Sequence, residues 1–390
     1  MPYAVGLTFR DGSPVVYDSG DYPACQAKAL DLAGYDGFRQ RQAAARQQDR
    51  HIGIGIGNCV EGTGLGPFEG CKVRIGTDGK VVVETGAAPQ GQGHRTMLAQ
   101  ICADALGMDM ADVTVVTADT AGVEFGIGTF GSRITVNAGS SVHVAAGKVR
   151  EKALKIASHL LEAAAEDLDI ADGRIFVKGV PDIGVPLTRV AAFAKGAPGF
   201  SMPDGITPGL EETNYFTPQR STYANGTHVA EVEVDVETGM VRILRYSVAH
   251  DCGKVVNPMT VAGQVVGGVA HGVGNALYEW MRYDENAQPV TTNFGEYLLP
   301  LATEMPRVDQ THLESPTPLN PLGVKGAGEG GTIPVPAAVA AAVEDALSPF
   351  GVKITCTPIT PPDLLALIDA ARGGGEGEGE GLQVDRHGRA

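Results

Sequence analysis

Glu329 lies in a stretch of sequence that can carry out acid–base chemistry. The run GVKGAGEGG places one carboxylate among glycines, four residues after Lys325, and an alanine-rich helical segment follows directly. A carboxylate with so little side-chain bulk around it can approach a bound molecule closely, and it can act as a general base when it is partly desolvated. The same negative charge would also stabilise the start of the following helix. The motif alone therefore leaves a catalytic and a structural interpretation open.

Two glycine-rich turns that lead into predicted helices contain groups that can hold an anion. Backbone N–H groups at a helix start are free to bind, and the helix dipole favours negative charge there. Amide, hydroxyl and guanidinium groups add donors that suit a phosphate. The first turn consists of Gln90, Gly91, Gln92, Gly93 and His94, and the second of Thr129, Phe130, Gly131, Ser132 and Arg133. Each turn by itself is also compatible with ordinary helix capping, for example by Ser132.

The glycines at positions 126, 128 and 131 match the G-x-G-x-x-G pattern, so an NAD(P)-binding dehydrogenase is an alternative. About eight residues separate the preceding predicted strand from the first of these glycines, whereas a Rossmann turn begins at the strand end. The acidic residue expected about 20 positions later would fall in a predicted helix. These two departures weigh against a nicotinamide cofactor.

The composition narrows the class of protein. A chain of 390 residues that is 43% hydrophobic and 19% charged is typical of a globular protein with more than one lobe. A net charge of −16 without any basic run argues against nucleic-acid binding, and no apolar stretch reaches the length that spans a membrane. The six cysteines are scattered without a C-x-x-C pair, which excludes a zinc ribbon or an iron–sulfur cluster built by this chain alone and fits a reducing cytoplasm.

The elements that must position these residues follow a repeated order. Turn signals at 77–79 and 237–239 each join two predicted strands, and a helix, a strand and a second helix follow each hairpin. This order predicts an α+β fold with two related lobes. We assign residues 1–50 to an N-terminal arm that docks on a partner chain, 51–200 to a first lobe, 201–372 to a second lobe that carries the acid, and 373–390 to an acidic, glycine-rich tail of disordered composition.

Taken in order, four motifs resemble the molybdenum hydroxylases of the xanthine oxidase family. They are GQGH before a helix, GTFGSR before a long helix, DCGKVVNPMTVAGQVVGG, and GVKGAGEGG. The resemblance runs from about residue 3 to about residue 370 and is to the second half of the molybdopterin-binding subunit. It is strongest to the branch that contains aerobic carbon monoxide dehydrogenase and bacterial heterocycle hydroxylases. It implies the two-lobed molybdopterin-binding fold of the aldehyde oxidase and xanthine dehydrogenase type.

The resemblance also implies an activity and a cofactor. The activity is oxidative hydroxylation of an electron-poor carbon, in an N-heterocycle, an aldehyde or a related compound, with water as the oxygen source. The cofactor is molybdenum on molybdopterin cytosine dinucleotide, whose dithiolene holds the metal, so no protein side chain needs to bind it. Glu329 occupies the position of the catalytic base. The remaining matches to cofactor-contacting positions are the turn 90–94 for pterin or phosphate, the turn 129–133 for the dinucleotide end, and Cys252, Asn257, Gln264, Lys325, Gly326 and Gly328.

Two departures from the family pattern matter. Arg95 stands where the family motif often has an acidic residue, so the local charge differs. The first half of the family's molybdenum subunit is absent from the sequence. We therefore expect a partner chain that carries the first half of the site, and further subunits that carry 2Fe-2S clusters and FAD. A non-catalytic assembly subunit is the remaining alternative, although the intact Glu329 and glycine loops argue against it.

Overall fold

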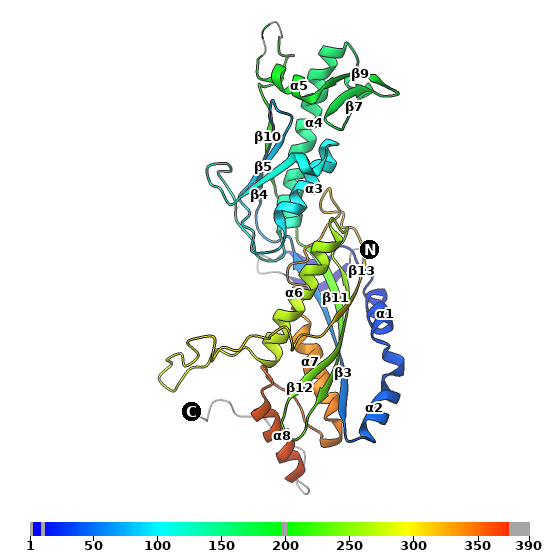
Figure 1. Ribbon diagram of the computed structural model, residues 1–390, viewed down its shortest axis with the longest axis vertical. Coiled ribbons are helices and arrows are strands. Elements are labelled where there is room, and N and C mark those ends of the chain that lie inside the picture. Colours follow the sequence, from blue (N-terminus) through cyan, green and yellow to red (C-terminus); the bar gives the residue numbers. More distant parts are fainter. Residues whose placement is uncertain (1–2, 9–11, 197, 199–200, 374–390) are drawn as a thin grey trace.

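The chain folds into two lobes arranged along its long axis, each built from a sheet and helices (Figure 1). The structure is a computed structural model that describes residues 3–8, 12–196, 198 and 201–373. The expected α+β, two-lobed fold is confirmed. The tail expected at 373–390 lies outside the described residues, except for Gly373. This residue is the last one of helix α8 (Pro361–Gly373). In the described part of the chain no helix combines the length and the apolar composition needed to cross a bilayer.

The upper lobe is built on a four-stranded sheet. Its strands, in spatial order, are β10 (Leu210–Phe216), β4 (Glu69–Ile75), β5 (Val81–Thr85) and β6 (Val113–Thr117). β4 and β5 form the expected hairpin, and α3 (His94–Leu106) carries the chain across to β6, which runs parallel to β5. A π-helical turn, Thr135–Gly139, then leads into the long helix α4 (Ser140–Leu161). Apolar side chains of the sheet and of both helices form one core.

A second, smaller sheet sits at the far end of the upper lobe (Figure 1). It consists of β7 (Leu168–Ala171), β8 (Arg174–Val177) and β9 (Val180–Pro186), and α5 (Leu187–Ala194) follows it. Its buried side chains join the core of the upper lobe. This extension makes no contribution to the cleft described below, whose lining residues lie elsewhere.

The lower lobe repeats the plan of the upper one. Its sheet contains β13 (Val308–Leu313), β12 (Val241–Asp251), β11 (Thr222–Val234) and β3 (His51–Thr63). β11 and β12 form a hairpin, α6 (Pro258–Leu277) leads to the parallel strand β13, and α7 (Val335–Ala346) follows. The order hairpin, helix, strand, helix is therefore present twice, as the sequence predicted.

The two lobes exchange their outer strands. β3 precedes the upper hairpin in the chain but pairs antiparallel with β11 along its full length, and β10 precedes the lower hairpin but pairs with β4. The sequence assigned β3 to the first lobe and β10 to the second, and the structure corrects both assignments. The reason is physical: an apolar strand shows which face it buries but not which neighbour it pairs with. The exchange ties the lobes together through two strands.

The N-terminal arm packs on the chain's own lower sheet. It contains a hairpin of β1 (Tyr3–Thr8) and β2 (Pro14–Tyr17), followed by α1 (Tyr22–Ala33) and α2 (Phe38–Arg46). The apolar side chains Cys25, Ala29 and Phe38 are buried against Ile52 and Ile54 of β3. We expected this arm to dock on a partner chain. The structure corrects this for the apolar face of the arm, which packs on the chain's own lower sheet.

Alternate glycines of β3 bring α7 against the strand backbone. A Cβ on Gly55 would lie 2.1 Å from the carbonyl oxygen of Ala338, and one on Gly53 would lie 2.1 Å from that of Ala342. Ile54 between them and Ile52 before them point to the opposite face, toward the arm. α7 therefore packs on β3 with no side chain in between, and this contact fixes the loop that enters α7.

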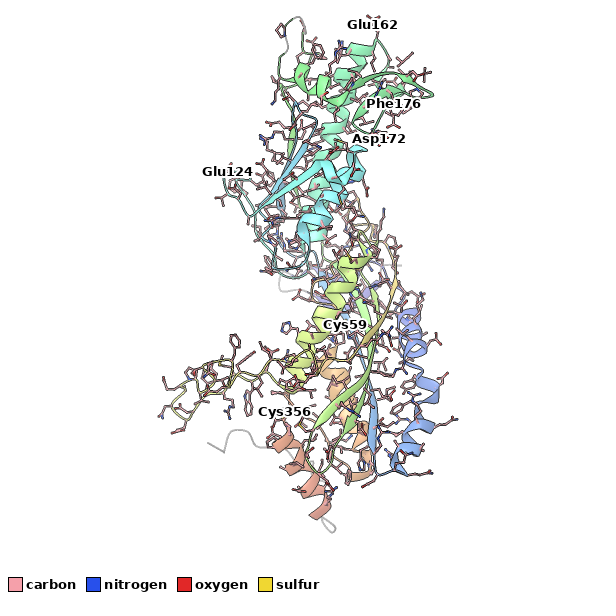
Figure 2. The ribbon with its side chains drawn as sticks, in the orientation of Figure 1. Cys59, Glu124, Glu162, Asp172, Phe176 and Cys356 are labelled. Atoms are coloured by element: carbon pink, nitrogen blue, oxygen red, sulfur yellow. The ribbon has the colours of Figure 1, made fainter. Side chains whose placement is uncertain are left out.

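The segment between α6 and β13 projects from the lower lobe (yellow in Figure 1), and Figure 2 shows its side chains standing clear of the body. It holds several large apolar side chains in water: Phe294 is 80% exposed, Leu301 65% and Tyr283 62%. Soluble chains rarely expose so many large apolar groups together unless another surface covers them.

Candidate functional site

A cleft of about 340 Å³ is lined by residues of both lobes. It brings together most of the residues that the sequence singled out. From the upper lobe these are Gln90, Gln92, His94, Thr129, Phe130, Gly131, Ser132 and Arg133, and from the lower lobe Cys252, Asn257, Gln264, Lys325, Gly326, Gly328 and Glu329. Gly91 and Gly93 lie in the same turn as the two glutamines but are not among the lining residues.

Two helices, one from each lobe, begin at the cleft. α3 starts after Gly93, whose φ of +76° is a conformation that glycine adopts without strain. α6 starts after Asn257, whose Oδ1 accepts a hydrogen bond from the N–H of Thr260 at 3.0 Å. The two starts are close, since a Cβ on Gly93 would lie 3.1 Å from Cγ2 of Thr260. The positive ends of both helix dipoles therefore meet at one place, which favours an anion.

The two glutamines of the first turn hold each other. The backbone N–H of Gln90 donates to Oε1 of Gln92 at 2.6 Å, and Nε2 of Gln92 donates to Oε1 of Gln90 at 3.1 Å. Gly91 between them has a φ of +106°. Among the described residues nothing accepts a hydrogen bond from Nε2 of Gln90, which can therefore donate to a bound molecule. Arg95 points away, with its guanidinium 3.3 Å from the hydroxyl of Thr117, and it does not line the cleft.

Arg133 supports the second turn from inside. Its guanidinium forms a fully buried ion pair with Glu69, whose Oε1 also accepts the N–H groups of Ile127 and Gly128. Three further donors of the guanidinium bind the carbonyl oxygens of Leu65, Phe68 and Gly128 at 2.5, 2.7 and 2.7 Å. Four of its five N–H groups are thus committed to the protein. From the sequence we expected Arg133 to bind an anionic ligand. In the structure its guanidinium instead holds the turn in place through bonds to Glu69 and to backbone carbonyl groups.

The glycines 126, 128 and 131 belong to this braced turn and not to a Rossmann site. The turn follows β6 only after a long connection, and the sheet around it mixes antiparallel and parallel pairs. A dinucleotide-binding dehydrogenase requires a parallel sheet with the glycine turn at the strand end. The geometry therefore contradicts the NAD(P)-binding alternative.

Lys325 is also committed to the protein. Its side chain is fully buried, with Nζ 3.8 Å from Oδ1 of Asp251 and 3.2 Å from the carbonyl oxygen of Ser19, to which it donates. Burial lowers the pKa of Lys325, and the charge of Asp251 opposes that shift. By contrast Lys254, which the sequence analysis did not single out, is exposed at the cleft, and no ion pair to it is found in the described part of the chain. Lys254 is therefore the cation best placed to meet an anionic ligand.

Cys252 and His94 are neutral parts of the cleft wall. Burial raises the pKa of the Cys252 thiol to about 12, so it is not a thiolate at neutral pH. Burial also lowers the pKa of His94, which keeps the imidazole uncharged. The carbonyl of Cys252 accepts the N–H of Lys325 at 2.7 Å, which joins the two motifs of the lower lobe. In the described residues no cluster of His, Cys, Asp or Glu could bind a metal ion.

Glu329 is the one carboxylate among the lining residues of the cleft. The hydroxyl of Ser132 lies 2.7 Å from its Oε2 and accepts its backbone N–H at 3.1 Å. The glycines beside it serve packing within the chain. A Cβ on Gly326 would lie 1.9 Å from the carbonyl oxygen of Ser132, and one on Gly330 would lie 2.3 Å from Nε2 of His250. The absence of side chains therefore lets the loop seat against the protein, whereas the sequence suggested room for a ligand.

A second acid, Glu61 at the end of β3, reaches the same serine. Its Oε1 lies 2.5 Å from the hydroxyl oxygen of Ser132. Burial, followed by the charge of Glu329, raises the pKa of Glu61 to about 8. Sequence reasoning missed this residue, because the strand exchange that brings β3 under the loop of Glu329 has no local signature.

Other cleft residues were missed because they are ordinary helix or loop positions in the sequence. They are Met97, Ile134, Thr135, Lys254, Val256, Thr260, Val261 and Ala327. Proximity to the two glycine-rich turns and to Asn257 is the signal that would have indicated most of them.

The model of one protein family, the molybdopterin cofactor-binding domain, matches residues 28–306. Among curated proteins, the chain is 38% identical over 367 residues to the 6-hydroxypseudooxynicotine dehydrogenase complex subunit gamma of Paenarthrobacter nicotinovorans; the match covers 94% of this chain and 46% of the relative. It is 36% identical over 330 residues to the carbon monoxide dehydrogenase large chain of Afipia carboxidovorans, covering 80% of this chain and 40% of the relative. The chain thus spans less than half the length of these relatives.

Solved structures give the same result. Quinoline 2-oxidoreductase from Pseudomonas putida 86 superposes with a TM-score of 0.86 at 39% sequence identity, covering 94% of this chain and 48% of the other. The two-lobed architecture described above is therefore that of a known group of proteins.

Proposed function

Since this chain belongs to the molybdopterin cofactor-binding family, we propose that its cleft holds the molybdenum cofactor and that Glu329 is the base of an oxidative hydroxylation. The substrate class is an electron-poor carbon, in an N-heterocycle, an aldehyde or a related compound, and water is the source of oxygen. One observation carries the proposal: a single carboxylate faces a cleft at which two helix starts and the exposed Lys254 converge.

The donors of the cleft suit the phosphates of a pterin dinucleotide, and we propose that it is the cytosine form. Such a group carries phosphates, and phosphates are bound by helix N-termini, amide groups and cations. The cleft provides the starts of α3 and α6, the side chains of Gln90, Asn257 and Gln264, and the ammonium of Lys254. When bound, the cofactor supplies the redox centre that takes two electrons from the substrate. Cys252 and His94, which are neutral, add no charge that would oppose it.

The residues of this chain then have separate tasks. Glu329 accepts the proton that is released as oxygen is transferred, and Ser132 holds its carboxylate in place. Lys325, which is buried against Asp251, anchors the start of the loop 325–331 that carries Glu329, and it does not bind the ligand. The Glu69–Arg133 pair keeps the turn 126–133 rigid, which preserves the position of Ser132. Prepositioning of this kind is what allows a general base to contribute its usual factor of about 10²–10⁴.

We further propose that additional polypeptide completes the site, since the relatives are about twice as long as the aligned region. It corresponds to the first half of the molybdenum subunit, on a separate chain or on further residues of the same one. The projecting segment between α6 and β13, with exposed Phe294 and Leu301, is the surface that it would cover. Electron transfer would require 2Fe-2S clusters and FAD on partner subunits. The six free cysteines agree with assembly in the cytoplasm.

The docking surface can be tested by co-expression with the neighbouring reading frame that encodes the remaining part of the subunit. We expect Phe294→Ser and Leu301→Ser to abolish co-purification. Ile183→Ser, a 51% exposed apolar residue on the distant small sheet, is the matched control and should leave it intact. Equal recovery of all three variants with the partner would contradict the assignment of this surface.

The activity can be tested on the assembled complex by metal and nucleotide analysis. We expect near-stoichiometric molybdenum and cytosine nucleotide. Glu329→Gln should leave both in place while turnover falls by about 10²–10⁴, and Glu124→Gln, a surface glutamate labelled in Figure 2, should leave turnover unchanged. An intact complex without molybdenum would favour the alternative of a non-catalytic assembly subunit. Loss of cofactor in Glu329→Gln would instead make that residue a ligand-binding group.

A further inference from the structure

Two carboxyl groups from distant parts of the chain meet on one serine hydroxyl. Oγ of Ser132 lies 2.5 Å from Oε1 of Glu61 and 2.7 Å from Oε2 of Glu329, and it accepts the backbone N–H of Glu329 at 3.1 Å. Ser132 is held in the left-handed region, with a φ of +48°, which is uncommon for a residue with a side chain. The neighbouring Gly326 packs directly on its carbonyl group. The position of this hydroxyl is therefore set by the backbone.

The number of protons at this hydroxyl limits what the two acids can be. A serine hydroxyl has one proton to donate and two lone pairs to accept with. One lone pair already accepts the N–H of Glu329. Of the two carboxyl contacts, one must then receive the hydroxyl proton and the other must donate a proton of its own. A carboxyl group can donate only when it is protonated. The arrangement thus requires a single proton on one of the two acids.

The surroundings identify Glu61 as the acid that holds this proton. Its Oε2 is buried without a hydrogen-bond partner in the described part of the chain, and none of the described lysines or arginines forms an ion pair with it. The titratable groups that face it are Glu329 and the thiol of Cys59, whose own pKa burial raises to about 12. β11 places Ala224 opposite it. Glu329, in contrast, is exposed on the cleft, where water can solvate its charge.

We infer that Glu61 is a protonated positioning residue that donates to Ser132 and thereby directs the hydroxyl of Ser132 to Glu329. In this chain of two hydrogen bonds Glu329 is the acceptor at the end, so its carboxylate is held in orientation toward the cleft. Cys59, labelled in Figure 2 in the upper part of the lower lobe, marks the part of β3 from which Glu61 reaches the site. The effect on turnover rests on the proposed function, whereas the position of the proton is a property of this chain alone.

The consequence is a dependence on pH with a midpoint near 8, the pKa to which burial raises the carboxyl group of Glu61. One hydroxyl proton then lies between two carboxylates, which repel each other, and Glu329 loses its fixed hydrogen bond. Glutamine at position 61 still presents N–H groups to the hydroxyl oxygen but cannot ionise. Leucine has neither property. Glu61→Gln therefore tests the effect of the charge at position 61 alone, and Glu61→Leu tests the additional loss of the hydrogen-bond donor to Ser132.

The first experiment is an infrared pH titration of the full chain without cofactor. We expect the absorption of a carboxylic acid to persist above pH 6 and to disappear with a midpoint near 8. It should be absent in Glu61→Gln and present in the surface control Glu124→Gln. In Glu329→Gln it should remain but with a lower midpoint, because the repelling charge is gone. A protein without any such acid above pH 6, or an acid that is lost in Glu329→Gln and kept in Glu61→Gln, would overturn the inference.

The second experiment uses the assembled, molybdenum-loaded enzyme. We expect kcat of the wild type to decline with a midpoint near pH 8, and Glu61→Gln to lack that decline. Glu61→Leu should lose about tenfold in kcat at every pH with little change in KM, the effect of one lost hydrogen bond. Identical pH profiles for wild type and Glu61→Gln would refute the positioning role. An enzyme that contains no molybdenum would refute the proposed function and leave the infrared result unaffected.

Discussion

Replacing Gly55 by alanine should destabilise the lower lobe, because α7 rests on the backbone of β3 at this position. The added Cβ would lie 2.1 Å from the carbonyl oxygen of Ala338 and 2.4 Å from the backbone nitrogen of Ala342. Non-bonded carbon contacts relax near about 3.5 Å, so the helix must move away by roughly 1 Å. Both contacted atoms belong to helix backbone, and no side-chain rotation can relieve them.

The size of the effect follows from two opposing terms. Overpacking of this kind costs about 1–3 kcal/mol, and two backbone contacts favour the upper end of that range. Alanine in a strand regains roughly 0.5–1 kcal/mol relative to glycine because the unfolded chain has less freedom. We therefore expect a net loss of about 2 kcal/mol in the free energy of unfolding. With a urea slope of about 2 kcal/mol per molar, the midpoint should fall by about 1 M.

The assay is urea unfolding followed by the fluorescence of Trp280, the single tryptophan, which follows α6 in the lower lobe. Gly267→Ala in α6 is the matched control, since a Cβ there meets no atom within 4 Å. Alanine in a helix interior is favoured over glycine by roughly 0.5–1 kcal/mol, so this midpoint should rise. A midpoint for Gly55→Ala at or above that of the wild type would refute the packing argument. Equal losses in both variants would refute it as well.

Three further predictions concern the charged groups. Because the pKa of Glu61 is raised in the folded state, that state holds more protons than the unfolded chain between about pH 4.5 and 8, so the free energy of unfolding should fall across this window as pH rises. Calorimetry should show that the free energy of unfolding falls less steeply with pH in Glu61→Gln than in the wild type, with a difference in slope of at most about 1.4 kcal/mol per pH unit. Equal slopes in the two proteins would contradict this. Arg133→Met should lower the free energy of unfolding by about 3–5 kcal/mol, because it leaves the buried carboxylate of Glu69 without its partner; circular dichroism measures this loss. A loss below about 1 kcal/mol would contradict the prediction. Lys254→Ala should weaken cofactor retention about fivefold, which is the effect of one exposed ion pair. The control Arg95→Ala, outside the cleft, should not change the molybdenum content. Equal effects of the two substitutions would argue against a role for Lys254.

Much of the fold could be predicted because it depends on local pattern. The two hairpins, the helix after each, and the order that repeats are all visible as alternation, helical spacing and turn residues. The glycine-rich turns were located correctly, and most of their residues line the cleft. What local pattern could not supply was the pairing of β3 with β11 and of β10 with β4, since either outer strand could have joined either sheet.

The same limit explains why the partners of two cations of the cleft could not be predicted. Arg133 and Lys325 resemble anion-binding cations in the sequence, yet both are buried in ion pairs with acids that lie far from them along the chain. Burial of a charge and the identity of its partner are tertiary properties, and they decide whether a cation is available to a ligand. Lys254 was overlooked because exposure at a cleft has no signature in the residue type.

By itself the sequence located Glu329 as the candidate acid of the site, because the glycines on both sides of it and the following helix are adjacent residues of the chain. Only the tertiary structure decided why those glycines are there and how the acid is held. Gly326 and Gly330 make room for Ser132 and His250, and the exchanged strand β3 brings Glu61 to the same serine. Contacts of this kind join residues that lie far apart along the chain, and their distances depend on how the two lobes pack.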